Sequence, residues 1–462
     1  MRKLVRGGTV VTAADSAQAD VLIEDEEIVA VGSLGEVEDA ETIDAGGCYV
    51  LPGLIDNHTH LSMPFGGTVS IDDYDTGTRA AAAGGTTCLV DFVIQQHPNG
   101  LRSSLEEWQE RANGAAHVDY GFHMAITQAD DATLADMGPM VEEGLCSFKV
   151  FLAYRGAIMV TDDLFFRVLE NTRDLGALTM VHCENGWAID VLVERALAAG
   201  QTEPIYHAQT RPEALEAEAT GRSVRFAELT GASVYIVHVT CGLAADEIAA
   251  GQARGVDVSG ETCLQYLTNT VEDLERPNFE GARYVCSPPL REAHNQDLLW
   301  AALKRGVLES VSTDHCPFND EQKAMGRNDF SKIPNGLAMI QHRLVKLWDI
   351  GVEAGRITPS ELVDLTSTAI AKRFGLHRKG SIAPGMDADL VVFDPSTPFE
   401  FSTRTSHMNV DYDLFEGETS TGSVRHTFSR GTMVYDRGEI LTEPGHGRFV
   451  PRSLREPAAV AT

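Results

Sequence analysis

Histidine, aspartate and lysine residues with the chemistry of metal ligands stand within short apolar runs of this chain or at their ends. His58 and His60 are separated by one residue, so in an extended strand both side chains point to the same side. Lys149 interrupts an apolar run, although only 8 of the 37 basic residues are lysines. A carboxylate and two more histidines close later apolar runs: His182, His238 and Asp314. Together these side chains could bind divalent cations.

Each of these residues also has a structural interpretation when taken alone. A single histidine at a strand end is commonly a hydrogen-bonded core residue, Lys149 could pair with a buried carboxylate, and Asp314 could cap a helix. Six such residues on one face favour a metal site instead, and imidazole and carboxylate suit Zn²⁺ as well as Mn, Fe or Co. A protonated lysine would repel the ions, whereas a lysine carbamylated by CO₂ becomes a carboxylate that can bridge two of them.

Eight apolar runs that alternate with helical patterns would position these side chains. Such alternation predicts a (β/α)₈ barrel, in which functional groups lie at the C-terminal ends of the strands. The alternative is a doubly wound open sheet, which predicts a Gly-rich turn after the first strand, where His58-Thr59-His60 stands instead. The expected strands are Val50–Asn57, Thr87–Ile94, Tyr120–Thr127, Ser147–Tyr154, Leu178–Cys183, Val234–Val239, Val256–Glu261 and Leu308–Thr313.

Both ends of the chain have the short, Gly- and Asp-punctuated apolar runs that are typical of β-structure. We therefore predict that residues 1–51 and 380–462 form one small β-sandwich domain with a C-terminal tail. Residues 52–379 would form the barrel.

The composition of the chain limits which cellular compartment and which binding partners we expect. The apolar fraction of 43% is ordinary for a globular protein, but the net charge of −31 makes nucleic acid and anionic lipid unfavourable partners. Eight scattered cysteines without a C-x-x-C pair predict buried, reduced thiols. No signal peptide and no apolar stretch of membrane-spanning length is evident, so we expect a cytoplasmic protein.

Longer motifs around these residues resemble the dihydropyrimidinase/hydantoinase branch of the amidohydrolase superfamily over nearly the whole chain. Together they are specific for that branch. The motifs are Gly53–Leu61, Met63–Thr68, Gly84–Thr87, Phe148–Tyr154, His182–Gly186, Cys286–Arg291, Thr313–Phe318 and Ile333–Gly336.

The resemblance implies a role for each site residue. Two zinc ions would be bridged by carboxylated Lys149, with His58, His60 and Asp314 holding one ion and His182 and His238 the other. Asp314 would also act as general base and then acid during hydrolysis of a cyclic amide to an N-carbamoyl amino acid. Tyr154 would polarise the substrate carbonyl, and backbone groups at Ser287 and Asn335 would hold the amide edge of the ring.

The resemblance also implies an apolar substituent pocket and an assembly. Loops Ser62–Asp72 and Ala153–Asp163 match those that line the pocket in the family, and the tail Gly445–Arg452 resembles a segment that packs on a neighbouring subunit. We therefore expect a homotetramer. The apolar residues expected in the pocket are Met63, Phe65, Leu152, Ile158 and Met159.

Two departures and three rival functions bear on the substrate. Ser62 stands where many relatives have Asp, and Leu337–Arg343 departs from the usual Pro-Gly and acidic pair. The alternatives are an allantoinase, a dihydroorotase and a scaffold without activity. A dihydroorotase would require an arginine soon after His60, but Leu61–Phe65 contains none, and a scaffold that had lost its metal ligands would not retain all six.

Overall fold

The computed structural model describes residues 2–96 and 98–454, and its central sheet has eight parallel strands. The strand order is β15-β14-β13-β12-β11-β10-β9-β6. A parallel bridge between Thr59 and His315 brings the two edges together, so the sheet nearly closes and the predicted (β/α)₈ barrel is confirmed. The strands are β6 (Leu54–Thr59), β9 (Thr86–Ile94), β10 (Asp119–Ala125), β11 (Ser147–Phe151), β12 (Leu178–His182), β13 (Val234–Ile236), β14 (Val258–Cys263) and β15 (Ser310–Ser312).

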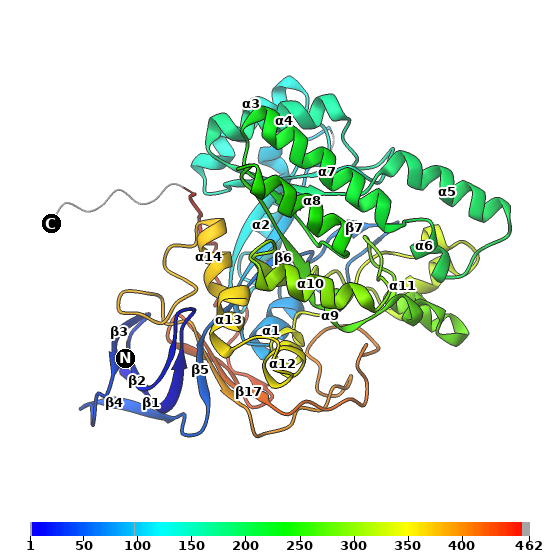
Figure 1. The fold of residues 1–462 in the computed structure, drawn as a ribbon. Coiled ribbons are helices and arrows are strands. Elements are labelled where there is room, and N and C mark those ends of the chain that lie inside the picture. Colours follow the sequence, from blue (N-terminus) through cyan, green and yellow to red (C-terminus); the bar gives the residue numbers. More distant parts are fainter. Residues whose placement is uncertain (1, 97, 455–462) are drawn as a thin grey trace.

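Helices surround this sheet (Figure 1). In α4 the buried positions Phe165, Val168, Leu169 and Thr172 follow helical spacing, and the left-handed Gly176 (φ 64°) ends the helix. The helices are α1 (Thr76–Ala83), α2 (Leu101–Ala112), α3 (Asp131–Glu142), α4 (Asp162–Leu175), α5 (Gly186–Ala198), α6 (Ile205–Gln209), α7 (Glu213–Thr230), α8 (Gly242–Ala253), α9 (Leu264–Thr268), α10 (His294–Lys304), α11 (Asp320–Lys323), α12 (Arg343–Leu347), α13 (Pro359–Val363) and α14 (Ala369–Phe374).

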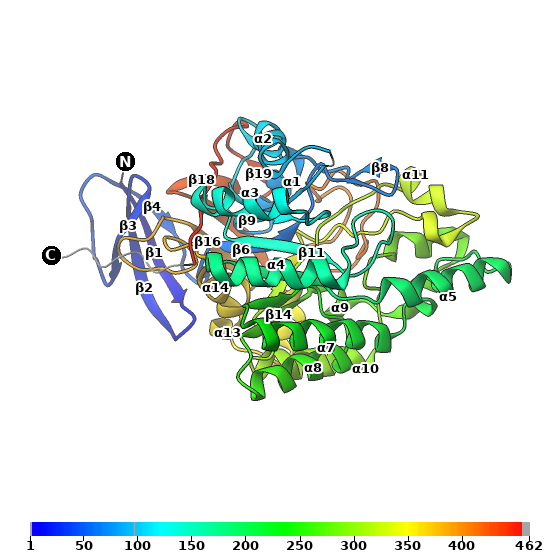
Figure 2. The ribbon, with the colours of Figure 1, turned by 90° about the horizontal axis from the view of Figure 1, so that it is seen from above.

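The two ends of the chain build a second, mostly antiparallel sheet, in the order β19-β18-β17-β16-β5-β1-β2-β3 with β4 beside β1. Figures 1 and 2 place β1–β4 and α5 at opposite ends of the molecule. Residues 1 and 455–462 of the predicted terminal segments lie outside the described residues. The strands are β1 (Arg2–Val11), β2 (Ser16–Glu24), β3 (Glu27–Gly32), β4 (Ala40–Asp44), β5 (Tyr49–Pro52), β16 (Leu390–Asp394), β17 (Ser423–Ser429), β18 (Thr432–Asp436) and β19 (Glu439–Ile440).

The expectation of one continuous strand over Val50–Asn57 is wrong. The chain changes sheets at Gly53: β5 pairs with β16, whereas β6 pairs with β9 in the barrel. A Cβ at Gly53 would lie 2.1 Å from Thr87 Oγ1, so the Thr87 side chain occupies the space that a larger residue would need. An apolar run of strand length could not reveal this corner, because both halves are buried.

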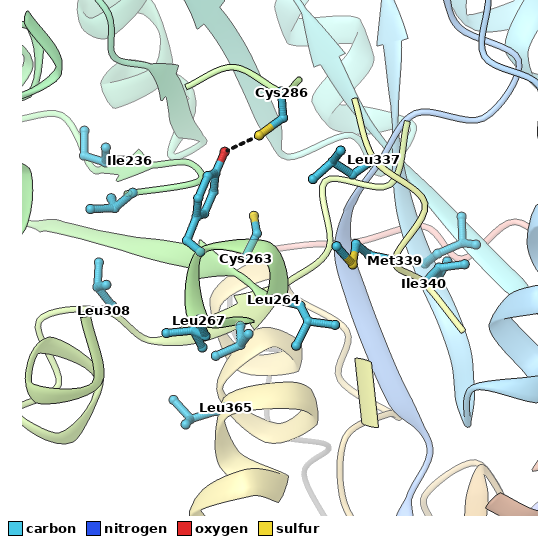
Figure 3. Close-up of a cluster of buried hydrophobic side chains, with 14 of the residues drawn as sticks. Ile236, Cys263, Leu264, Leu267, Cys286, Leu308, Leu337, Met339, Ile340 and Leu365 are labelled. Atoms are coloured by element: carbon cyan, nitrogen blue, oxygen red, sulfur yellow. Dashed lines mark hydrogen bonds between the residues drawn. The ribbon is translucent and has the colours of Figure 1, made fainter. Parts of the chain in front are cut away.

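A buried apolar cluster supports the loops beyond the C-terminal ends of the last barrel strands (Figure 3). The hydroxyl of Tyr266 donates to the Pro288 carbonyl at 2.8 Å and lies 3.8 Å from Cys286 Sγ. These contacts with Tyr266 therefore support the segment around Ser287. Labelled members of the cluster are Ile236, Cys263, Leu264, Leu267, Cys286, Leu308, Leu337, Met339, Ile340 and Leu365.

The C-terminal tail packs on its own barrel, and its contact with a neighbouring subunit stays a prediction. Its backbone runs beside β10, with a parallel bridge between Phe449 and Tyr120. Arg452, only 2% exposed, reaches the start of β11 and donates to Ser147 Oγ at 2.9 Å and to the carbonyl of Phe122. The tail thus contacts the strand that carries Lys149.

All eight cysteines are buried and none forms a disulfide, as the sequence predicted. Among residues 2–96 and 98–454, no helix combines the length and the apolar character needed to cross a membrane.

Candidate metal centre and substrate pocket

The structure brings all six predicted metal-ligand residues together at the C-terminal ends of the barrel strands. Three of them lie within strands β6, β11 and β12, and the others follow β6, β13 and β15 within two residues. Each side chain is buried. The six are His58, His60, Lys149, His182, His238 and Asp314.

Their polar atoms converge closely. Asp314 Oδ1 lies 3.1 Å from Nε2 of both His58 and His60, and Lys149 Nζ lies 3.0 Å from His58 Nε2. On the other side, His182 Nδ1 lies 2.9 Å from Nε2 of His238. Ligand atoms of His58, His238 and Asp314 all lie within 4.8 Å of one another, so the two sets of side chains share one small space.

The protonation states of the histidines and of Asp314 at this centre favour the binding of a cation. Burial and the nearby lysine hold the pKa of His58 well below its usual value, and burial also lowers the pKa of His60 and His238. Burial would raise the pKa of Asp314, but the two adjacent histidines outweigh it and hold the value at about 2. Burial lowers the pKa of Lys149 to about 8. Neutral imidazoles and an ionised carboxylate are the forms that bind metals.

The chemistry of the donor set tests that fit. Nε2 of His60 faces Asp314 and Nε2 of His238 faces His182, so each of these rings presents one nitrogen to the centre. Four buried imidazoles and one buried carboxylate therefore share this small space. Such a set of nitrogen and oxygen donors fits bound divalent ions.

Three of the predicted site residues have a strained backbone. Tyr154, His238 and Asp314 adopt left-handed conformations, with φ angles of 64°, 41° and 49°. Non-glycine residues rarely adopt this region, and each such residue costs about 1–3 kcal/mol. The surrounding structure maintains this strain, which is typical of functional sites.

Glu261 belongs to this centre, although sequence reasoning did not assign it there. It lies in β14, and its carboxylate contacts Nδ1 of His58 and the side-chain amide of Asn57. Burial raises its pKa to about 7. A carboxylate on the second nitrogen of a ligand histidine orients the ring. The signal was present, because the predicted strand Val256–Glu261 ends on this residue.

The three predicted substrate-binding residues line a pocket over the metal centre, together with His60, Lys149, His182, His238 and Asp314. Asn335 Nδ2 donates to Ser287 Oγ at 3.0 Å. The centroid of the Tyr154 ring lies 5.3 Å from the centroid of the His182 ring. Burial raises the pKa of Tyr154, so its hydroxyl remains protonated and can donate a hydrogen bond.

Apolar side chains also line this pocket. Met63, Phe65 and Ile158 line it as expected, together with Ile94 and Phe151. The expectation for two other residues is wrong: Leu152 packs in the core, and Met159 Sδ lies against Gly186. Residues 155–158 form a turn in which the amides of Ala157, Ile158 and Met159 all donate to the Tyr154 carbonyl, so neighbouring side chains of this loop point in different directions.

Comparisons with known proteins agree with this geometry. Residues 49–434 match the amidohydrolase family. The chain is 49% identical to a D-hydantoinase of Geobacillus stearothermophilus over 98% of this chain and 97% of that protein, and 47% identical to a D-hydantoinase of Streptomyces coelicolor over 98% of both. The crystal structure of dihydropyrimidinase from Brevibacillus agri NCHU1002 matches with a TM-score of 0.97 and 50% identity, covering 99% of this chain and 100% of that one.

Proposed function

Because this chain belongs to the amidohydrolase family and is a cyclic amidohydrolase of its hydantoinase/dihydropyrimidinase branch, we propose that its preferred substrate is a ring with an apolar substituent. The observation that carries the proposal is a pocket lined both by polar groups and by the apolar side chains of Met63, Phe65 and Ile158. A 5-substituted hydantoin likewise presents both an amide edge and an apolar group. Hydrolysis gives an N-carbamoyl amino acid.

The cofactors in this proposal are two divalent ions, most simply Zn²⁺. His58, His60 and Asp314 would hold one and His182 and His238 the other. Lys149 would bridge them after its neutral amine adds to CO₂, forming an N–C bond and releasing a proton. Such ions supply Lewis acidity, which makes water nucleophilic near neutral pH and polarises a carbonyl group.

The chain's own residues then direct the proton and the developing charge. Water attacks the ring carbonyl carbon, and Asp314 accepts its proton as general base. Tyr154 donates a hydrogen bond to the carbonyl oxygen as negative charge develops there. When the C–N bond breaks, Asp314 returns the proton to the departing ring nitrogen. Backbone groups at Ser287 and Asn335 hold the amide edge of the ring in place.

A kinetic panel tests the proposed substrate. Hydantoin, 5-alkyl and 5-aryl hydantoins, dihydrouracil, allantoin and dihydroorotate would be compared by kcat/KM, with metal content measured on the same samples. We expect the aryl or alkyl hydantoins to rank first. A preference for allantoin or dihydroorotate would contradict the proposal.

Tyr154→Phe tests the role assigned to the hydroxyl. Loss of one oxyanion donor typically lowers kcat about 10²-fold or more. KM should change less, because the hydrogen bond strengthens only as the oxygen gains charge. Metal content should remain that of the wild type, since no ligand is removed. Near-normal kcat with a strongly raised KM would instead make Tyr154 a ground-state binding residue.

We further propose that residues 1–51 and 380–462 fold as one domain beside the 52–379 barrel, and that the protein is a cytoplasmic homotetramer. Large apolar side chains on α5, α8 and α10 support the assembly, because Trp187, Leu243 and Leu298 are 55%, 51% and 45% exposed. Light scattering at micromolar concentration should give four times the 50.0 kDa chain mass. A monomer mass would refute the tetramer.

A further inference from the structure

Lys323 is a buried lysine at the end of α11. It is only 1% exposed, and Nζ donates to the carbonyls of Pro334 and Gly336 at 2.8 Å and of Val285 at 3.1 Å. An ammonium group has three N–H donors, so these three carbonyls satisfy it completely. Across residues 2–96 and 98–454, no carboxylate forms an ion pair with Lys323 that would account for its burial instead.

The three carbonyls belong to two segments that form part of the polar lining of the pocket. Val285 precedes Ser287 by two residues, and Pro334 and Gly336 flank Asn335. These segments also bond to each other directly, because the Gly336 amide donates to the Val285 carbonyl at 2.9 Å. On the side away from the pocket, Cys286 and Leu337 enter the apolar cluster of Figure 3. Lys323 therefore supports both segments without facing the substrate.

We infer that Lys323 is a positioning residue for substrate binding, whose three hydrogen bonds set the spacing between the Ser287 and Asn335 segments. The inference rests on the proposed function, in which backbone groups of these two segments hold the amide edge of the ring. An apolar residue in this place would fill the space but leave three carbonyls without their donor. The segments would then separate or rotate, and the ring would bind less tightly.

The preceding residue on α11 supports a segment of the apolar lining. Gln322 Nε2 donates to Thr68 Oγ1 at 2.7 Å and to the Val69 carbonyl at 2.8 Å. Thr68–Val69 is β8 and pairs with β7 (Pro64–Phe65), whose Phe65 belongs to the apolar lining. Two adjacent residues therefore support different parts of the pocket lining, and this provides an internal comparison.

The test measures kcat and KM of Lys323→Met and Gln322→Ala across the ring panel. For Lys323→Met we expect KM to rise about tenfold for every ring, while kcat stays within about threefold, because the ring's shared amide edge is affected and the metal centre is not. For Gln322→Ala we expect a change in the ratio between aryl-substituted and unsubstituted rings. Lys332→Met, which removes an exposed lysine nearby, should leave both constants unchanged.

Two controls separate a positioning role from a purely structural one. Metal content should stay at the wild-type value in every variant, and melting temperature identifies variants that do not fold. If Lys323→Met does not fold, Lys323→Arg tests the inference in its place. The larger guanidinium must push the three carbonyls apart, so this variant should also raise KM severalfold. Rescue of KM by arginine to within twofold of the wild type would overturn the inference.

Other outcomes also distinguish the hypotheses. Unchanged KM in a folded Lys323→Met protein overturns the inference, as does a loss confined to kcat or to metal content. Absence of ring opening by the wild-type protein on the whole panel would instead remove the proposed function. The two failures are therefore separable.

Discussion

Lys149→Ala is expected to lose bound metal and ring-opening activity together. The lysine is the one proposed ligand that contacts both ions, and its Nζ lies 3.0 Å from His58 Nε2 in the centre of the cluster. Without a bridge, four histidines and one aspartate remain as two incomplete sets. We expect kcat to fall on the order of 10³-fold or more, because water is then no longer activated. Elemental analysis and turnover on one sample measure both losses.

Small carboxylates should partly restore this variant. The truncation leaves a cavity where the lysine side chain passes Phe92 and Phe151, with Nζ 4.3 Å and 4.8 Å from their ring centres. Formate or acetate can occupy it and present the carboxylate that the carbamate supplied. Chloride at equal ionic strength is the control and should restore nothing. A Lys149→Ala protein that kept both metals and full activity would contradict the bridge, and so would a free ammonium in metal-loaded wild-type protein.

Asp314→Asn is expected to reduce kcat by roughly 10²- to 10⁴-fold, the usual contribution of a general acid–base residue. Asparagine has nearly the same shape and keeps one oxygen, but it cannot accept the proton from water. The pKa of about 2 means that the wild-type carboxylate is ionised at every pH where the protein would be assayed. Parallel measurements of kcat and bound metal are therefore informative.

The metal measurement distinguishes two ways of losing activity. Retention of both ions with a low kcat assigns the loss to proton transfer, whereas loss of one ion assigns it to coordination. Asp246→Asn, on the exposed face of α8, is the matched control and should change neither quantity. Activity of Asp314→Asn near that of the wild type would remove this residue from the mechanism.

The periodicity of apolar residues was sufficient to predict the barrel. The polar residues in or after the predicted strands were sufficient to select the six candidate metal ligands. The parallel strands are buried on both faces, so they read as continuous apolar runs, and a polar residue at the end of such a run stands out. This is why the amino-acid sequence alone singles out His182 and Lys149. Their roles in binding ions remain predictions.

Other features depend on contacts between distant segments and have no local signal. The corner at Gly53 exists because Thr87 lies against it, 34 residues later in the chain. The carboxylate of Glu261 could be placed at a strand end, but its contact with His58 Nδ1 depends on how far the barrel brings β14 toward β6. The left-handed backbone of Asp314 likewise has no signal in its residue type, because non-glycine residues rarely adopt that region.

The position of Arg452 has a consequence for biosynthesis. Its guanidinium donates to the Phe122 carbonyl and to Ser147 at the start of β11, which are translated some three hundred residues earlier. A nascent chain can form its strands in order while still on the ribosome, but these contacts form only after Arg452 has left the exit tunnel. Chains truncated before Arg452 therefore lack the support beneath β11, although they contain every residue of the proposed metal centre.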